Sequence, residues 1–163
     1  MSILSHKLQL EDVEEDYHLL AIHSPLEDYK IAYFLNKQLG LNLKRARCDV
    51  DFNHGAVQAL YPLYVFKEPA KYISIYLIKN KFKGANKKVI SVGSLFSEEE
   101  FSPQVTFLIP EYKEVDYFLK IEGDLENCEI EGFLSQMALI PNIITTFAVD
   151  VNQLKSKNNL ILD

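Results

Sequence analysis

The sequence has little of what marks the more specialised classes of protein. Its 163 residues include only two cysteines, six glycines and no tryptophan, and it has no run of about 18 apolar residues that could cross a membrane. Cys48 and Cys128 lie far apart and form no Cys-x-x-Cys pair, so the sequence does not predict a zinc or iron–sulfur site. We expect both thiols to be reduced and buried in a cytoplasmic protein rather than joined in a disulfide.

Motifs of the common catalytic classes are also missing. The sequence has no glycine-rich loop of the dinucleotide-binding or P-loop type, and no Gly-x-Ser-x-Gly element that would expose a nucleophilic serine. The histidines His6, His18, His23 and His54 do not have the spacing of metal ligands. We therefore predict no catalytic residue, no metal site and no cofactor, and we expect the protein not to be an enzyme.

Composition and charge are those of an ordinary globular domain. Hydrophobic residues make up 48% of the chain and glycines and prolines occur singly, so we expect a single domain over residues 1–163. The formal net charge of −6 does not attract nucleic acid through the overall field, which leaves only a local basic patch as an RNA site. The first ten residues lack the features of a secretory signal, so a cytoplasmic location is expected.

Periodicity in the sequence predicts an α+β fold. Ser24 and Glu27 have the spacing of a helix capping box, and apolar residues at helical intervals continue from there to a stop at Gly40. A second helix is expected after Gly123, and residues 79–88 are expected to form a hairpin tip or long loop. We predict a mixed, mostly antiparallel sheet with both helices on one face. The expected strands are 16–23, 43–52, 60–67, 72–79, 89–92, 104–109, 115–122 and 143–149.

Two parts of the chain resemble each other. Residues 16–19 match residues 116–119 at an offset of 100, and similar helix and closing-strand residues follow in both copies. Each copy has the order of an acidic lead-in, a strand, a helix and a strand. This predicts two β–α–β pseudo-repeats at about 11–51 and 111–150, with central strands in 60–109, and an expanded ferredoxin-like fold. Shared apolar patterning between unrelated elements is the alternative.

The most distinctive segment is 109–117 (IPEYKEVDY). Its motif residues resemble the signature of the IPExxxVDY family of Bacteroidetes-type bacteria, and the resemblance implies a lineage without an established activity. The motif residues are Ile109, Pro110, Glu111, Val115, Asp116 and Tyr117.

The acidic residues of this segment have two interpretations. Glu114 and Asp116 would share one face of a strand, and with Glu111 they could form an acid–base or metal cluster. No histidine is close in sequence, so a solvated outer strand face is the simpler interpretation. We expect Val115 and Tyr117 to face the apolar side of the strand. Glu111, Glu114 and Asp116 then remain as the candidates for contact with another molecule.

Positive charge gathers in residues 79–88, where lysines surround one phenylalanine. These lysines could hold RNA or an acidic protein surface while the ring stacks on a base. A second, smaller basic group shares a face of the strand predicted at 43–52. A solvated hairpin tip is the alternative for the lysines. The candidate binding residues are Lys79, Lys81, Phe82, Lys83, Lys87, Lys88, Arg45 and Arg47.

Tyrosines are frequent in the predicted central strands. Tyr61, Tyr64, Tyr72 and Tyr76 either form an interaction surface or follow ordinary strand propensity. The sequence therefore favours a small cytoplasmic binding or scaffold domain that contacts a protein partner and can self-associate. An RNA-associated accessory factor acting through residues 79–88 and a small-molecule sensor domain are the alternatives.

Overall fold

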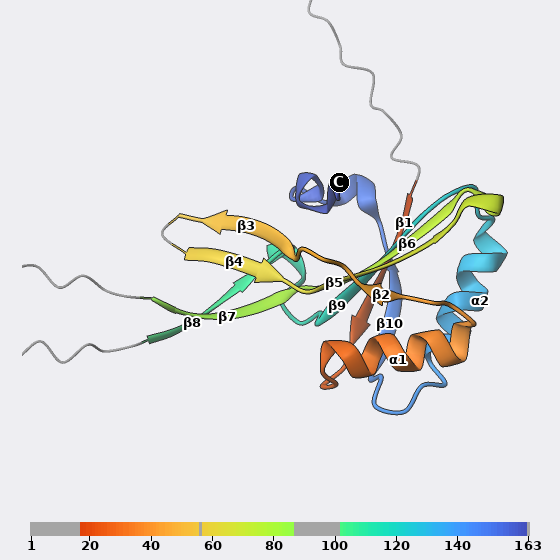
Figure 1. The fold of residues 1–163 in the computed structure, drawn as a ribbon, viewed down its shortest axis with the longest axis horizontal. Coiled ribbons are helices and arrows are strands. Elements are labelled where there is room, and N and C mark those ends of the chain that lie inside the picture. The colour runs from red at the N-terminus through yellow and green to blue at the C-terminus, as the bar shows by residue number, and fades with distance from the viewer. Residues whose placement is uncertain (1–16, 56, 87–101, 163) are drawn as a thin grey trace, which may run out of the picture.

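A computed structural model describes residues 17–55, 57–86 and 102–162. They form an α+β fold on a six-stranded antiparallel sheet with the strand order β10-β1-β9-β6-β5-β2 (Figure 1). The strands of this main sheet are β1 (Tyr17–His23), β2 (Lys44–Arg45), β5 (Leu63–Glu68), β6 (Ile73–Lys79), β9 (Tyr117–Glu122) and β10 (Thr145–Val149).

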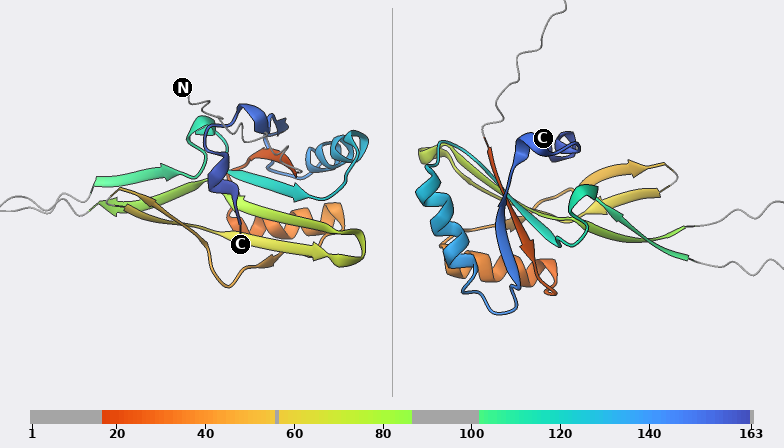
Figure 2. Two further views of the ribbon diagram at one scale, coloured as in Figure 1. Left: turned by 90° about the horizontal axis from the view of Figure 1, so that it is seen from above. Right: turned by 180° about the vertical axis from the view of Figure 1, so that it is seen from behind.

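Two further strand pairs form hairpin-like arms. One arm consists of β3 (Val50–His54) and β4 (Val57–Tyr61), and the other of β7 (Lys81–Asn86) and β8 (Ser102–Phe107). Figure 2 shows both arms projecting from the end of the sheet that lies away from α2 (Asn127–Met137). The arms therefore add a surface that the helices do not cover.

Both helices pack on one face of the main sheet, as the sequence predicted. Ile31 and Leu35 of α1 (Asp28–Leu39) and Ile130 and Met137 of α2 are buried in one cluster with alternate residues of the central strands. The apolar residues recur at helical intervals, so each helix turns one side toward the sheet. We call this side the helix face.

The start of α1 differs from the expected capping box. The helix begins at Asp28, and its N-cap residue Glu27 makes no side-chain cap. The Ser24 hydroxyl donates instead to the carbonyl of Asn142 at 2.8 Å, which ties the loop before α1 to the turn before β10. A capping box does form at α2, between Glu126 and its own first turn. Gly40 ends α1 in the left-handed conformation at a φ of 65°, as predicted.

The other face of the sheet, the turn face, is also buried. It is covered by the 3-10 turns η2 (Pro110–Tyr112), η3 (Val151–Gln153) and η4 (Lys157–Leu160) and by part of the β3–β4 arm. The second buried cluster here includes Phe118 of β9. The alternation in residues 115–122 predicted a polar outer face, and that prediction is wrong because the C-terminal segment folds back over the strand.

Lys120 shows how the turn face accommodates a charge. Its side chain is buried, and its Nζ donates to Glu122 Oε1 at 2.6 Å and to the carbonyl of Leu160 at 2.9 Å. The same ammonium lies 4.6 Å from the centre of the Tyr17 ring. Paired hydrogen bonds and an aromatic face offset the loss of water around the charge.

The order β10-β1-β9-β6, with α1 and α2, is that of a ferredoxin-like fold, and β5 and β2 extend it. The strands of the unit β9–α2–β10 lie on either side of β1.

The first predicted pseudo-repeat does not end in a strand of the main sheet, as the second one does. Its expected strand at 43–52 breaks into β2 and β3, so Val50 lies in an arm whereas its sequence match Val149 lies in the main sheet. A duplication of the chain stays a prediction.

The central strands also differ in detail from the prediction. The strand predicted at 60–67 is divided at Pro62 into β4 and β5, since proline cannot donate to a strand ladder. Residues 81–86 form β7 rather than a loop, and the strand predicted at 89–92 lies outside the described residues. The predicted tyrosine surface is wrong for three members, because only Tyr72 is exposed. Buried are Tyr61, Tyr64 and Tyr76.

The cysteines are free, as predicted, but both are exposed, so the expectation of buried thiols is wrong. Cys48 lies in the bend between β2 and β3, and Cys128 lies in the first turn of α2. No helix within the described part of the chain is long and apolar enough to cross a membrane.

Candidate functional site

The signature residues form a corner between β8 and β9 that is built around Asn80. This side chain is fully buried, and its Oδ1 accepts from the backbone N–H of Ile109 at 2.8 Å. Its Nδ2 donates to the carbonyls of Tyr112 at 2.9 Å and Val115 at 3.0 Å, and its backbone N–H donates to the carbonyl of Asp116. One amide thus bonds to three backbone groups of the corner, at Ile109, Tyr112 and Val115. Nothing in the local pattern indicates this role beyond an isolated Asn between two predicted strands.

The apolar residues of the signature serve packing. Ile109 and Val115 are buried in the cluster of the turn face, and Pro110 is exposed at the start of η2. The expectation that Val115 is part of the core is confirmed. It lies on the turn face, however, whereas Tyr117 belongs to the cluster of the helix face.

Tyr117 ties the start of β9 to the loop before α1. Its hydroxyl donates to the carbonyl of Leu26 at 2.5 Å. Burial, with the nearby charges of Asp28, Glu27 and Asp116, raises the pKa of Tyr117 well above its ordinary value. The phenol therefore stays protonated, and it acts as a donor and not as a base.

Asp116 is the most connected side chain of the signature. Its Oδ2 lies 2.6 Å from His23 Nδ1 and accepts from the backbone N–H of Ser24 at 2.9 Å, while its Oδ1 accepts from Lys81 Nζ at 2.7 Å. No histidine is close to this segment in sequence, but the fold brings one to it. The antiparallel register of β1 and β9 pairs Ile22 with Tyr117 and so brings His23 to the carboxylate.

Glu111 holds the C-terminal segment. Its carboxylate accepts from the backbone N–H groups of Lys155 and Ser156, both at 2.8 Å, and from the Ser156 hydroxyl. Burial by itself would raise the pKa of Glu111, but the hydrogen bonds from Ser156 and Lys155 outweigh it and lower that pKa below its ordinary value.

The three candidate carboxylates therefore do not converge. Glu111 bonds to the C-terminal segment, Asp116 bonds to β1 and β7, and Glu114 is exposed. Within the described ranges, no group of three or more His, Cys, Asp or Glu residues is placed to hold a metal ion. The sequence offered two interpretations of Asp116, a carboxylate cluster and a solvated strand face, and both are wrong. Asp116 is instead a mostly buried side chain bonded to β1 and β7.

An open groove of about 820 Å³ lies beside this corner. Its walls come from the loop 24–27 before α1, from the start of β9 and from the β7–β8 arm. Apolar side chains line much of it, namely Leu26, Leu60, Phe82, Val105 and Phe107. Four lysines line it as well, namely Lys79, Lys81, Lys83 and Lys113.

The structure thus brings together three of the predicted binding lysines. Lys79 lies 3.8 Å from a carboxylate oxygen of Glu27, and Lys81 is bonded to Asp116. Lys83 makes no ion pair with any residue that the structure describes. The predicted residues Lys87 and Lys88 lie outside the described residues.

Lys113 is a groove residue that the sequence reasoning missed. It occupies one of the variable positions of the signature, exposed at the end of the corner. It has no ion pair within the described ranges, as is the case for Lys83. The only signal for it was a lysine inside an otherwise acidic and apolar motif.

Phe82 is a wall of the groove and not a free ring. It is half-buried at the turn-face cluster, with its ring centre 6.3 Å from that of Tyr61 in an edge-on arrangement. Gly84 leaves room for it, because a Cβ atom there would lie 2.7 Å from the ring. The predicted stacking of Phe82 on a base would require one exposed ring face, which this packing restricts.

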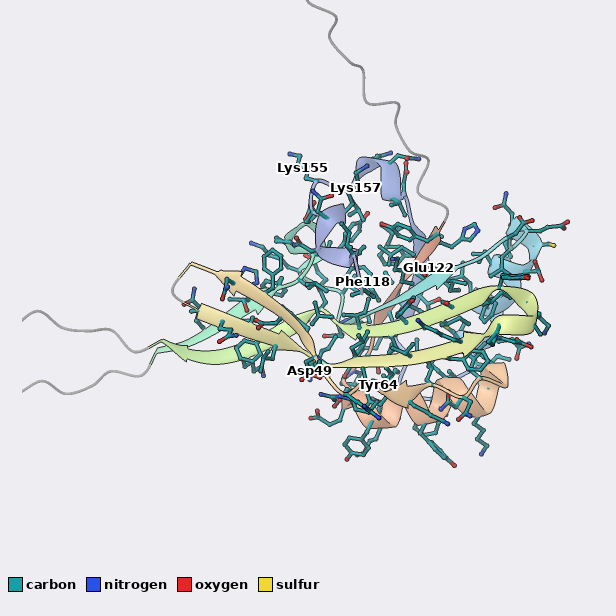
Figure 3. The ribbon with its side chains drawn as sticks, turned by 45° about the horizontal axis from the view of Figure 1, so that its top comes forward. Asp49, Tyr64, Phe118, Glu122, Lys155 and Lys157 are labelled. Atoms are coloured by element: carbon teal, nitrogen blue, oxygen red, sulfur yellow. The ribbon has the colours of Figure 1, made fainter. Side chains whose placement is uncertain are left out.

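Arg45 and Arg47 lie outside the groove. Arg45 pairs with Asp28 of α1 at 2.8 Å and with Asp49, and its guanidinium lies over the ring of Tyr64. Figure 3 labels Asp49 and Tyr64 near α1. Arg47 is exposed and lines, with Arg45, a shallower depression of about 550 Å³. The predicted basic residues therefore do not form one patch.

The groove is suited to binding rather than to bond breaking. Its four lysines outnumber its two carboxylates, Glu27 and Asp116, so an anionic group with an apolar part would be held by both kinds of wall. The nearby hydroxyls of Ser24 and Tyr117 already donate to backbone carbonyls. No protein-family model, curated protein or solved structure matches the chain, so its function is inferred from these residues.

Proposed function

We propose that the protein is a small binding module that holds an acidic segment of a protein partner in the lysine-lined groove and catalyses no reaction. One observation carries the proposal: Lys83 and Lys113 lie in an open groove of about 820 Å³ without ion pairs among the described residues. Phe82 and Phe107 add apolar walls that would accept side chains next to the acidic groups. A groove of this size takes several side chains.

The arrangement favours a protein segment over RNA. Two of the four groove lysines, Lys79 and Lys81, are already paired with Glu27 and Asp116, which lowers the attraction for a continuous phosphate backbone. The half-buried ring of Phe82 offers little stacking surface. An RNA-associated role remains the second candidate because lysines alternate at 79, 81 and 83, from the end of β6 into β7.

Two further expectations belong to the proposal. The protein would act in the cytoplasm, and it would belong to the IPExxxVDY family on the strength of its six signature residues. The corner that those residues build positions Lys113, and Asp116 positions Lys81. In this view the signature supports the groove instead of forming a catalytic centre.

The test is a titration with a short fluorescein-labelled peptide rich in glutamate and phenylalanine. The double variant Lys83→Glu, Lys113→Glu should weaken binding by about tenfold or more, since it replaces attraction with repulsion at two groove cations that make no ion pair with the described residues. The matched control is Lys37→Glu, Lys67→Glu, which changes net charge equally at exposed positions outside the groove. The control should stay within about twofold of the unmodified protein.

Two outcomes would overturn the proposal. Equal loss of binding in both double variants would show that only net charge matters. Tighter binding of oligouridine than of the peptide, again lost in the groove variant, would replace the protein segment with RNA.

A further inference from the structure

The two edges of the main sheet are protected to different degrees. The β2 edge is only two residues long, and both Lys44 and Arg45 are exposed and charged. Short, charged edge strands discourage pairing with another chain. The β10 edge has five residues, Thr145–Val149, and none of them carries a charge. Of these two edges, as formed by the described residues, the β10 edge is therefore the one suited to extension of the sheet.

The outer side of β10 has no strand beside it among the described residues. Its one pairing is with β1, from Leu19 opposite Val149 to His23 opposite Thr145. Phe147 is exposed, and the turn leading into β10 exposes Leu139 and Ile144, with 67% and 63% of their surfaces accessible. Large apolar side chains thus gather along an edge whose backbone groups can still accept a partner.

The residues of β10 are complementary to a second copy of themselves. In an antiparallel pairing centred on Phe147, this residue faces its own symmetry mate, Thr145 faces Val149 and Thr146 faces Ala148. The next pair sets Ile144 against Asp150, so no two like charges meet. Asp150 is already bonded within its own chain, to the backbone N–H of Asn152 at 3.1 Å.

We infer that two copies of this chain associate through β10, which joins their main sheets into one continuous sheet across a two-fold axis. The pairing would be isologous, with Phe147 on the axis and each chain giving and receiving the same contacts. This surface is separate from the groove, because no residue of β10 lines it. The inference therefore stands or fails independently of the proposed function.

The contact area is small, so the dimer should form reversibly and depend on concentration. A single pair of five-residue strands with a few flanking side chains lies at the low end of specific interfaces, below about 1,200 Å². Sedimentation velocity of the full chain over about two decades of concentration should show a monomer converting to a dimer.

Charge placed at the axis tests the geometry. Phe147→Lys sets two like charges opposite each other and should raise the dimer dissociation constant by about tenfold or more. Phe147→Glu should do the same alone, whereas an equimolar mixture of the two variants should recover the dimer. Ala148→Lys is a second disrupting variant at an exposed position, in case Phe147 is needed for its contact with Tyr112.

The expected result is loss of the dimer in each single variant, its recovery in the mixture, and unchanged peptide binding in the groove. Circular dichroism would confirm that each variant is folded. A protein that stays monomeric at every concentration would overturn the inference. So would a dimer that survives both Phe147→Lys and Ala148→Lys, since the copies would then associate elsewhere.

Discussion

The two faces of the main sheet are covered by different kinds of structure. On the helix face, α1 and α2 satisfy their own backbone groups and contribute mostly apolar side chains to the sheet, with the exception of Asp28, which bonds to Arg45 and Tyr64. On the turn face, irregular segments lie over the strands, and single polar side chains bond to the backbone of those segments. These side chains are Asn80, Glu111 and Lys120. A sheet covered by turns depends on a few polar side chains more than one covered by helices.

The contrast also bears on function. Phe82, which packs against the cluster of the turn face, and Lys113, which lies in the corner, both line the groove. Changes to the turn face near these residues should therefore disturb binding as well as stability. Changes to the helix face at residues that do not line the groove should reduce stability alone.

The largest effect is expected from Asn80→Leu. It removes the bonds to the buried N–H of Ile109 and the buried carbonyl of Val115, and one of the two bonds to the carbonyl of Tyr112, so the free energy of unfolding should fall by about 4 kcal/mol. Urea unfolding followed by circular dichroism measures it. Asn36→Leu is the matched control, because that amide bonds only to the backbone N–H and carbonyl of Leu43, on the helix side of the sheet. If the control lowers the free energy of unfolding by the same amount, the turn face does not depend on its amide more than the helix face does.

The next effect concerns the helix face. Leu35→Ala removes a fully buried side chain of α1 and should lower the free energy of unfolding by about 3 kcal/mol through lost burial and the cavity left behind. The same urea titration measures it. Peptide binding to the groove, assayed well below the unfolding transition, should be unchanged. A weakened peptide affinity would show that the two faces are coupled.

A smaller effect is expected at Lys120. Lys120→Ala removes the bonds to Glu122 and Leu160 and leaves space under the C-terminal turns, which should cost about 2 kcal/mol. Lys120→Met keeps most of the apolar stem and should cost less than about 1 kcal/mol, because a buried charge contributes little net stability once its desolvation is counted. Equal losses in both variants would show that the ammonium itself is essential.

The smallest effect is the pH dependence given by Glu111. Its pKa is lowered in the folded protein, so its contribution to stability is complete above the ordinary value of 4.5 and is lost as pH falls below that value toward the folded pKa. Glu111→Gln should flatten the fall of the urea midpoint below pH 4.5. A Glu111→Gln variant whose urea midpoint falls with pH as steeply as that of the unmodified protein would contradict this prediction.

Much of the helix face could be predicted from the sequence. Local patterns predict the apolar intervals of α1 and α2 and the end of α1 at Gly40. They also predict strands close to β1, β6, β9 and β10. The break of 43–52 into two strands could not be predicted this way, since alternation continues across the bend. The polar outer face predicted for β9 failed for a related reason: nothing local shows that residues 151–160 return to cover it.

The residues of the candidate site also fall into a group that the sequence could predict and a group that it could not. Lys79, Lys81 and Lys83 could be found because a run of alternating lysines is a local signal. The pairing of His23 with Asp116 depends on the register between strands far apart in the sequence, and the role of Asn80 depends on a turn that forms nearly thirty residues later. Such contacts are set by tertiary structure and leave no periodic trace.

The bonds from Glu111 to Lys155 and Ser156 have a consequence for how the domain folds during its synthesis. The corner cannot be completed until residues 155–156 have left the ribosome, and β1 cannot pair with either neighbour until β9 and then β10 have emerged. Nascent chains would therefore expose Leu19 throughout the synthesis of the nearly one hundred residues between β1 and β9. A chaperone that binds apolar strand segments would encounter this protein early, and it would release the protein only once those last strands and turns are in place.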